Sequence, residues 1–164
     1  MEIERRFVVA AFPEELEVLR RAEVKQGYIS TGEPEARIRW TKDEHKTTYK
    51  LGFKTDGTLA REEVEFDISE ENYTNLKRLL KGEMITKDYR VYALPGNKRL
   101  EVCKVDEGMP TEYMYAEVEF ESIEEAKAFD YTCIPYFVKE VTEDRSYNMK
   151  RYWVHTRVKL ISCL

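Results

Sequence analysis

The sequence of 164 residues has few cysteines, no long apolar run and no excess of positive charge. Its 3 cysteines show no short metal-ligand spacing, and an odd count does not predict a disulfide framework, so a reducing cytoplasm fits best. Because no run of about 18 apolar residues occurs, we expect a soluble protein without a membrane-spanning helix. The 27 basic and 32 acidic residues give a formal charge of −5, which does not favour nucleic acid or an anionic membrane as a partner.

Internal repeats, low-complexity tracts and Gly/Ser linkers are also missing. A chain of this length is long enough for one core and short for two, so residues 1–164 are expected to form a single domain. Charged residues make up 36% of the chain, but aromatic residues make up 12%, and this aromatic content argues against disorder. The composition leaves open whether the protein is a monomer or a homodimer.

Alternation of apolar and polar residues with period two predicts a chain rich in β-strands. Eight strands are expected: Glu2 to Val9, Glu23 to Ser30, Glu35 to Lys42, Lys46 to Lys54, Leu59 to Ile68, Met84 to Leu94, Lys98 to Asp106 and Glu112 to Phe120. Asp56-Gly57 and Pro95-Gly96-Asn97 lie between successive strands as tight-turn signals, which indicates antiparallel hairpins.

Helices are expected between and after these strands. Pro13 to Arg21 begins with a proline and two acids, which suit a first helical turn. Ser69 to Lys81 has Ser69 as an N-cap, and Ser122-Ile-Glu-Glu125 is a capping-box pattern ahead of a short helix. A further helix is expected over Ser146 to Val158.

Charged residues recur two apart along the expected strands, so that Glu2 and Glu4 flank Ile3. If the apolar set faces outward under the helices, the charged set lines the interior of a closed eight-stranded barrel. The inward acids would be Glu2, Glu4, Glu63, Glu65, Glu101, Glu117 and Glu119, and the inward bases Arg6, Arg37, Arg39, Lys50, Lys54, Arg61 and Lys87. Because unpaired buried ions cost several kcal/mol each, such a lumen should hold water and suit a polyanion with a metal. On the pattern alone, a sheet with one solvated, ion-paired face remains an alternative.

The same residues carry a resemblance to a known family. Glu2-Ile-Glu4-Arg-Arg6 resembles the Glu-x-Glu-x-Lys signature of the CYTH family, the triphosphate tunnel metalloenzymes. Further segments recur in the family's order: Gln26-Gly-Tyr28, Ala36-Arg-Ile-Arg39, Phe53-Lys54, Leu59-Ala-Arg-Glu-Glu-Val-Glu65, Lys87, Leu100-Glu-Val102, Ala116-Glu-Val-Glu119 and Val141-Thr-Glu-Asp-Arg-Ser-Tyr147. The resemblance spans residues 1 to about 150, and an ordered set of this kind is far more specific than one short motif.

This resemblance implies an α+β, mainly β fold: an eight-stranded antiparallel tunnel in which basic side chains grip phosphates and glutamates hold Mg²⁺ or Mn²⁺. Carboxylate oxygens suit a hard cation, and guanidinium groups match phosphate oxygens two at a time. The implied metal ligands are Glu2, Glu4, Glu117 and Glu119. The implied substrate-binding residues are Arg6, Arg37, Arg39, Lys54, Arg61, Lys87, Arg90 and Arg145. The catalytic set is Glu63, Glu65 and Lys54, with the two glutamates binding a second metal or orienting the attacking water.

Three positions depart from the family's pattern. Arg6 stands where the family usually has lysine, and Cys103 stands where many members have an aspartate ligand. The arginine of a common Lys-x-Arg motif is displaced by one residue in Lys87-Asp-Tyr-Arg90. Because a shift of one residue reverses the face of a side chain, Arg90 would reach the lumen only through a β-bulge.

The favoured function is metal-dependent hydrolysis of triphosphate chains, with inorganic tripolyphosphate giving pyrophosphate and phosphate. The expected lumen offers charges for phosphates but no recognisable pocket for a base, a thiazole or a sugar. One alternative is an adenylate cyclase of class IV, which Arg145-Ser-Tyr147 also resembles. Another is a non-catalytic module that binds polyphosphate or nucleotide, suggested by Cys103 and the displaced Arg90.

Overall fold

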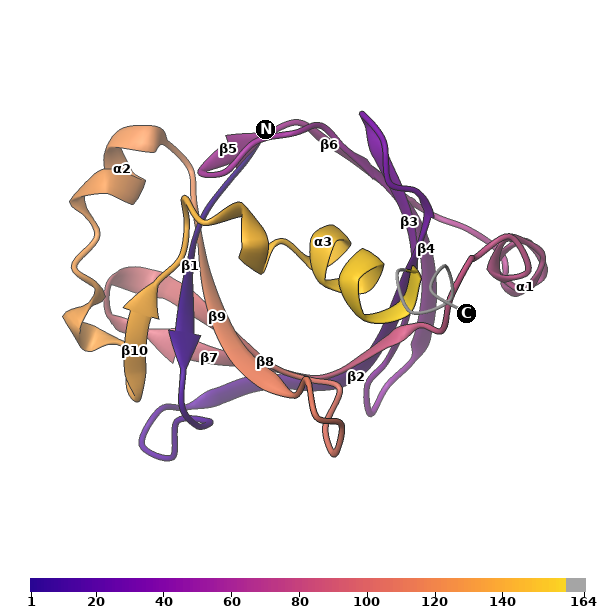
Figure 1. Cartoon of the computed structure of the whole chain (residues 1–164). Coiled ribbons are helices and arrows are strands. Elements are labelled where there is room, and N and C mark those ends of the chain that lie inside the picture. Colours follow the sequence, from indigo (N-terminus) through magenta and orange to yellow (C-terminus); the bar gives the residue numbers. More distant parts are fainter. Residues whose placement is uncertain (159–164) are drawn as a thin grey trace.

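The computed structural model describes residues 1–158, and within them an antiparallel 10-stranded sheet curls into a barrel (Figure 1). The strands are β1 (Glu2–Val9), β2 (Val18–Ser30), β3 (Glu35–Lys42), β4 (Thr47–Lys54), β5 (Ala60–Arg61), β6 (Glu63–Asp67), β7 (Ile85–Leu94), β8 (Lys98–Val105), β9 (Tyr113–Phe120) and β10 (Phe137–Glu140). Their order is β10-β1-β9-β8-β7-β2-β3-β4-β6, and β5 pairs with β1. The predicted mainly β antiparallel barrel is therefore confirmed.

The barrel closes through a segment that the sequence presents as one strand. The expected strand from Leu59 to Ile68 is divided at Glu62, because β6 pairs with β4 whereas β5 pairs with the first residues of β1. A strand that changes partner must interrupt its ladder at the change. The short β10 was not predicted; its four residues are all exposed and show no alternation, and it pairs with the far end of β1.

The main core lies on the outer face of β1, β7, β8 and β9. Phe7, Val102 and Val118 are fully buried there, beneath α2 (Ile123–Ala128) and the chain that follows it. Arg5 fastens this cover, since its guanidinium donates to Glu140 and to the carbonyl oxygens of Ala126 and Phe129. The apolar set thus faces outward, as the alternation predicts, and the charged set faces the lumen.

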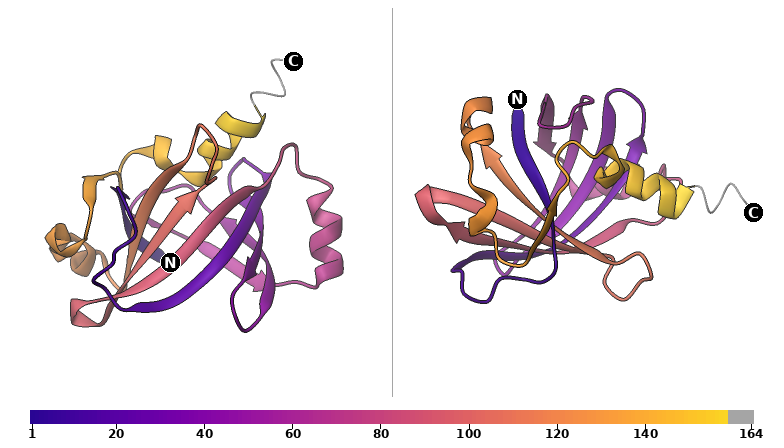
Figure 2. Two further views of the ribbon diagram at one scale, coloured as in Figure 1. Left: turned by 90° about the horizontal axis from the view of Figure 1, so that it is seen from below. Right: turned by 60° about the vertical axis from the view of Figure 1, so that its left-hand side comes forward.

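Two helices pack outside the barrel on opposite flanks (Figures 1 and 2). In α1 (Glu70–Lys77) the side chain of Ser69 accepts from the backbone N–H of Asn72, which confirms the predicted N-cap. In α2 the Ser122 side chain accepts from the N–H of Glu125, while the Glu125 carboxylate accepts from the N–H of Glu121. Short 3₁₀ turns at Pro95–Asn97 and Tyr131–Cys133 join neighbouring elements.

The C-terminal part covers one end of the barrel (Figure 1). A 3₁₀ turn (Arg145–Tyr147) leads into α3 (Met149–Trp153) and a π-helical turn (Val154–Val158). Trp153 is buried with its ring centroid 5.8 Å from that of Tyr28, and Arg157 binds Asp106 through two hydrogen bonds of 2.7 and 2.8 Å. This helix, expected from Ser146 to Val158, is present in shortened form and covers part of one end of the lumen.

The expected helix from Pro13 to Arg21 is wrong. Residues 13–17 form an irregular connection, and β2 begins at Val18, where it pairs with β7. Pairing across the sheet overrides the local helix-start signals of Pro13 and its acids, because those signals contribute less than a strand's ladder. Among residues 1–158, no helix has the length and apolar character needed to cross a membrane.

Candidate active site

Strand register brings the charged side chains to one inward surface. Glu4 lies opposite Glu119, and Arg6 opposite Glu117, in the pairing of β1 with β9. Glu101 of β8 in turn lies opposite Glu117. Because side chains alternate across a strand, these residues and their neighbours two positions away all face the lumen.

The lumen contains a cavity of about 350 Å³ with both signs of charge on its wall. It is lined by nearly all of the predicted site residues: Glu2, Glu4, Arg6, Arg37, Arg39, Lys54, Arg61, Glu63, Glu65, Lys87, Glu117 and Glu119. Lys50 and Glu101 line it as well. The alternation therefore predicted the wall of this cavity, and only Arg90 and Arg145 lie elsewhere.

Several bases in the cavity are neutralised by acids. Lys54 Nζ lies 2.8 Å from a carboxylate oxygen of Glu2, and Arg37 Nη2 lies 3.5 Å from both Glu63 and Glu65. Arg61 is held by Glu35 at 2.8 Å. These ion pairs stabilise the charged side chains inside the lumen, since buried ions without partners would be costly.

Two other bases have no such partner. Among the described residues, no carboxylate lies within ion-pair distance of Arg39 or Lys87; Arg39 bonds the side chain of Gln26 at 3.3 Å, and Lys87 donates to the hydroxyl of Tyr115 at 2.6 Å. The Nε atoms of Arg39 and Arg37 are buried without any hydrogen-bond partner. Burial lowers the pKa of Lys87 to about 7. This part of the wall is short of negative charge and suited to an anionic guest.

The carboxylates on the opposite wall pair with one another. Burial and the hydrogen bond with Glu2 raise the pKa of Glu63 to about 7. For Glu2, burial opposes the charge, but the bond with Glu63 and the nearby Lys54 lower the pKa to about 2. Burial and the neighbouring Glu117 likewise raise the pKa of Glu4 well above its usual range. Each pair holds one proton more readily than two separate carboxylates would.

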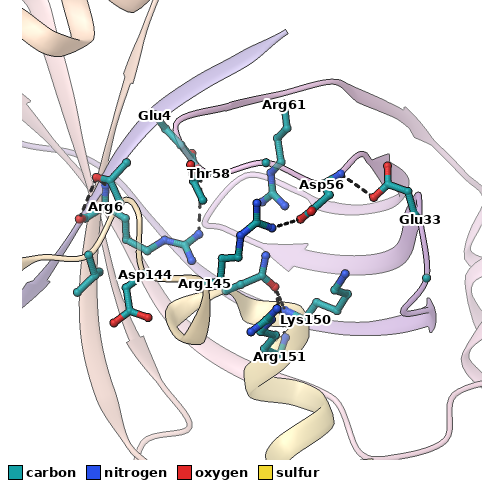
Figure 3. A pocket seen from close by; sticks show the side chains of 15 residues that line it. Glu4, Arg6, Glu33, Asp56, Thr58, Arg61, Asp144, Arg145, Lys150 and Arg151 are labelled. Carbon is teal, nitrogen blue, oxygen red and sulfur yellow. Dashed lines mark hydrogen bonds and ion pairs between the residues drawn. The ribbon is translucent and has the colours of Figure 1, made fainter.

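A second cavity, also of about 350 Å³, lies at the mouth beside the C-terminal segment (Figure 3). It shares Glu4, Arg6 and Arg61 with the lumen, and its outer wall carries Arg145 and Asp56. We call this cavity the vestibule. Arg145 thus stands at an entrance to the lumen rather than within it.

The comparisons with known proteins agree with this geometry. No family model matches the sequence. The chain is 34% identical over 149 residues to an inorganic triphosphatase from Nitrosomonas europaea, a match that covers 91% of this chain and 94% of the relative. It also matches the crystal structure of an inorganic triphosphatase at 30% identity and a TM-score of 0.64, over 93% of each chain. This chain belongs to the CYTH family, the triphosphate tunnel metalloenzymes.

More distant structures share the fold of this CYTH protein. A protein from Pyrococcus horikoshii OT3 matches with a TM-score of 0.58 at 19% identity, covering 77% of this chain and 82% of its own. An adenylyl cyclase candidate from Hippeastrum with a dominant triphosphatase activity matches with a TM-score of 0.54 at 15% identity, covering 77% and 83%. At these identities the likeness extends to the barrel alone.

Two departures of this CYTH protein from the family's pattern have clear structural settings. Arg90 lies on the outer face, 2.9 Å from Asp88, with its guanidinium 3.7 Å from the ring centre of Phe12. The pairing of β7 with β8 is regular from Lys87 to Leu94, so no bulge turns Arg90 inward and the expected substrate contact is not supported. Cys103 faces the lumen, where burial raises the pKa of its thiol to about 11, and it supplies no charge there.

Two residues that the motifs did not point to also line the lumen, Tyr89 and Tyr115. Tyr115 accepts a hydrogen bond from Lys87, and Tyr89 donates its hydroxyl hydrogen to Glu101. Both stand at inward positions of strands that alternation predicted. The alternation of side chains along each strand could therefore have found them, whereas a search limited to charged residues could not.

Proposed function

We propose that this protein hydrolyses inorganic tripolyphosphate to pyrophosphate and phosphate inside the barrel, with Mg²⁺ or Mn²⁺ bound to the glutamates. The observation that carries the proposal is a pair of bases without carboxylate partners among the described residues, the partly buried Arg39 and the buried Lys87, which line one cavity together with the carboxylates. The chain is an enzyme of the triphosphatase class, as membership of the family shows. The identity of the substrate and the need for metal are the proposed steps.

The donor set of the carboxylate wall fits a hard divalent cation. No three acid, thiol or imidazole groups within residues 1–158 converge as a preformed metal site, since the acids are engaged with Arg6, Lys54 and one another. Yet burial and the neighbouring Glu117 raise the pKa of Glu4, and two adjacent carboxylates of this kind are a place that a cation can take. Glu4 and Glu117, with Glu2 and Glu119, would hold the metal. When bound, it would neutralise negative charge on the phosphate oxygens.

The basic wall would bind and orient the phosphate chain. Arg37 and Arg39 lie on β3 with buried Nε donors that have no partner, and a guanidinium group can give two parallel hydrogen bonds to one phosphate. Lys54 and Lys87 add point charges from β4 and β7. Glu63 and Glu65, which face Arg37 at 3.5 Å each, are suited to orient the attacking water.

The lining of the cavity favours an inorganic chain over a nucleotide. At the covered end, the rings of Tyr28 and Trp153 pack on each other, and Tyr115 is engaged by Lys87. A purine would therefore have to displace packed side chains to find a ring to stack on.

The test is a substrate panel with the purified wild-type protein. Tripolyphosphate, ATP and thiamine triphosphate are incubated with Mg²⁺, with Mn²⁺ or with a chelator, and phosphate, pyrophosphate and cyclic AMP are quantified. We expect metal-dependent release of phosphate with the highest kcat/KM on tripolyphosphate. Cyclic AMP from ATP would instead support a cyclase, and calorimetric binding without turnover would support a binding module; either result contradicts the proposal.

A further inference from the structure

An ion pair spans the vestibule between two parts of the chain that lie far apart in sequence. Arg145 Nη1, in the C-terminal segment, lies 2.5 Å from Oδ1 of Asp56, in the turn between β4 and β5 (Figure 3). A second bond runs beside it, from the hydroxyl of Thr58 to the carboxylate of Glu143 at 2.6 Å. The turn and the C-terminal segment are thus tied together across the mouth of the lumen.

The position of Asp56 is set by the turn that carries it. Its backbone N–H donates to the carboxylate of Glu33 at 2.8 Å. A Cβ atom at the next residue, Gly57, would lie 2.3 Å from the carbonyl oxygen of Ala60, so this tight turn requires glycine. Asp56 is therefore a counter-anion held in place for Arg145.

An anion can nevertheless replace Asp56 as the partner of Arg145. The side chains of Arg145 and Asp56 are 46% and 59% exposed, and ion pairs exposed to this degree are weak. The vestibule also reaches Arg6 and Arg61, which line the lumen. An anion with several charges that extends from the lumen to the vestibule would offer Arg145 a stronger partner than one carboxylate.

We propose that Asp56 competes with the anionic substrate for Arg145, an inference that rests on the proposed function. In the empty protein Asp56 holds the guanidinium. A bound triphosphate takes Arg145 from Asp56, and after hydrolysis Asp56 recovers it from the smaller product. The competition weakens binding of substrate and product alike and so promotes release of pyrophosphate.

The first test replaces the competitor. Asp56→Asn should lower the KM for tripolyphosphate and the inhibition constant of pyrophosphate by about two- to fivefold, the range of an exposed ion pair. Asp88→Asn is the matched control, because it makes the same change in net charge and breaks a similar pair with Arg90 on the outer face. Its constants should equal those of the wild type. An unchanged or raised KM in Asp56→Asn would overturn the inference.

A double-mutant cycle separates competition from the general field of a negative charge. In the Arg145→Met background, Asp56→Asn should have no effect on KM or on the inhibition constant, because the guanidinium for which Asp56 and the substrate compete is gone. If Asp56→Asn lowers both constants by the same factor in that background, Asp56 acts only by electrostatic repulsion of the anion, and the inference is wrong.

Failure of the proposed function is distinguishable from failure of the inference. If wild-type protein binds tripolyphosphate without hydrolysing it, the proposed function fails, and the dissociation constants from calorimetry still decide the cycle. If wild-type protein hydrolyses tripolyphosphate but the cycle shows no coupling between Asp56 and Arg145, only the inference fails.

Discussion

At the scale of single residues, the lumen divides its charges into those already partnered and those left for a guest. Glu4 belongs to the first group, since it faces Glu117 and lies 3.7 Å from Arg6. Glu4→Gln keeps the shape of the side chain but removes a proposed metal ligand. We expect kcat on tripolyphosphate to fall on the order of a hundredfold, the scale of losing one preorganised electrostatic contact.

The measurement is phosphate release at saturating Mg²⁺ or Mn²⁺, with circular dichroism to confirm the fold. Glu121→Gln is the control, because Glu121 follows β9, the strand that pairs with β1, and is exposed. Full activity in Glu4→Gln would remove Glu4 from the metal set.

Lys87 belongs to the second group, and its burial destabilises the folded protein. Its pKa of about 7 lies below the ordinary 10.5, so between these values the unfolded chain binds a proton that the folded chain does not. Its contribution to stability therefore rises with pH across this window, and the penalty is largest below pH 7. Lys87→Met should raise the Tm by several degrees at pH 7, less at pH 10, and weaken tripolyphosphate binding.

Thermal unfolding at pH 7 and pH 10 measures the change in Tm, and calorimetry at pH 7 measures the change in affinity for tripolyphosphate. Lys77→Met is the control, since Lys77 ends α1 with its side chain exposed. A lower Tm at pH 7 together with unchanged binding would show that Lys87 is a structural residue.

At the scale of elements, the C-terminal helix is held by a buried ion pair. Arg157 and Asp106 have side chains 7% and 1% exposed, and Asp106 also accepts from Tyr152 and from the N–H of Thr86. Asp106→Asn leaves Arg157 without its counter-charge, while asparagine still tolerates the φ of 50° at this position. We expect a loss of about 3 kcal/mol in the free energy of unfolding.

Urea unfolding measures this loss. Asp106→Asn combined with Arg157→Met should cost less than the sum of the two single changes, because the double variant leaves no unpaired charge. Strict additivity would mean that the pair does not hold the helix. Arg78→Met, at the exposed end of α1, is the control for loss of an arginine.

Elements also show what the sequence could and could not predict. The predicted bounds of the strand Glu35–Lys42 match the structure. One face of this strand packs against apolar side chains and the other faces the charged lumen, so apolar and charged residues alternate along the sequence. Pro13 to Arg21 failed because its helix signals are local, whereas pairing with β7 is not. Asp56 and Arg145 are 89 positions apart in the sequence, and their ion pair joins the turn after β4 to the 3₁₀ turn that begins at Arg145, so no periodicity could reveal it.

At the scale of the whole molecule, the barrel holds an interior that a ligand should complete. Burial and a neighbouring carboxylate raise the pKa of Glu4 and of Glu63, while Lys54 pairs with Glu2. A metal-bound triphosphate would satisfy both walls at once, so binding should be linked to folding. At a ligand concentration of a hundred times Kd, the free energy of unfolding rises by about 2.7 kcal/mol.

For a chain of this size, that gain corresponds to a rise in Tm of about 5–10 °C with Mg²⁺ and tripolyphosphate together. Scanning fluorimetry measures it, with sulfate at equal ionic strength as the control for salt. Either component alone should give a smaller rise, because each satisfies one wall and leaves the charges of the other unmatched. An equal rise with tripolyphosphate in the presence of a chelator would show that the carboxylate wall needs no metal, and that the two walls act independently.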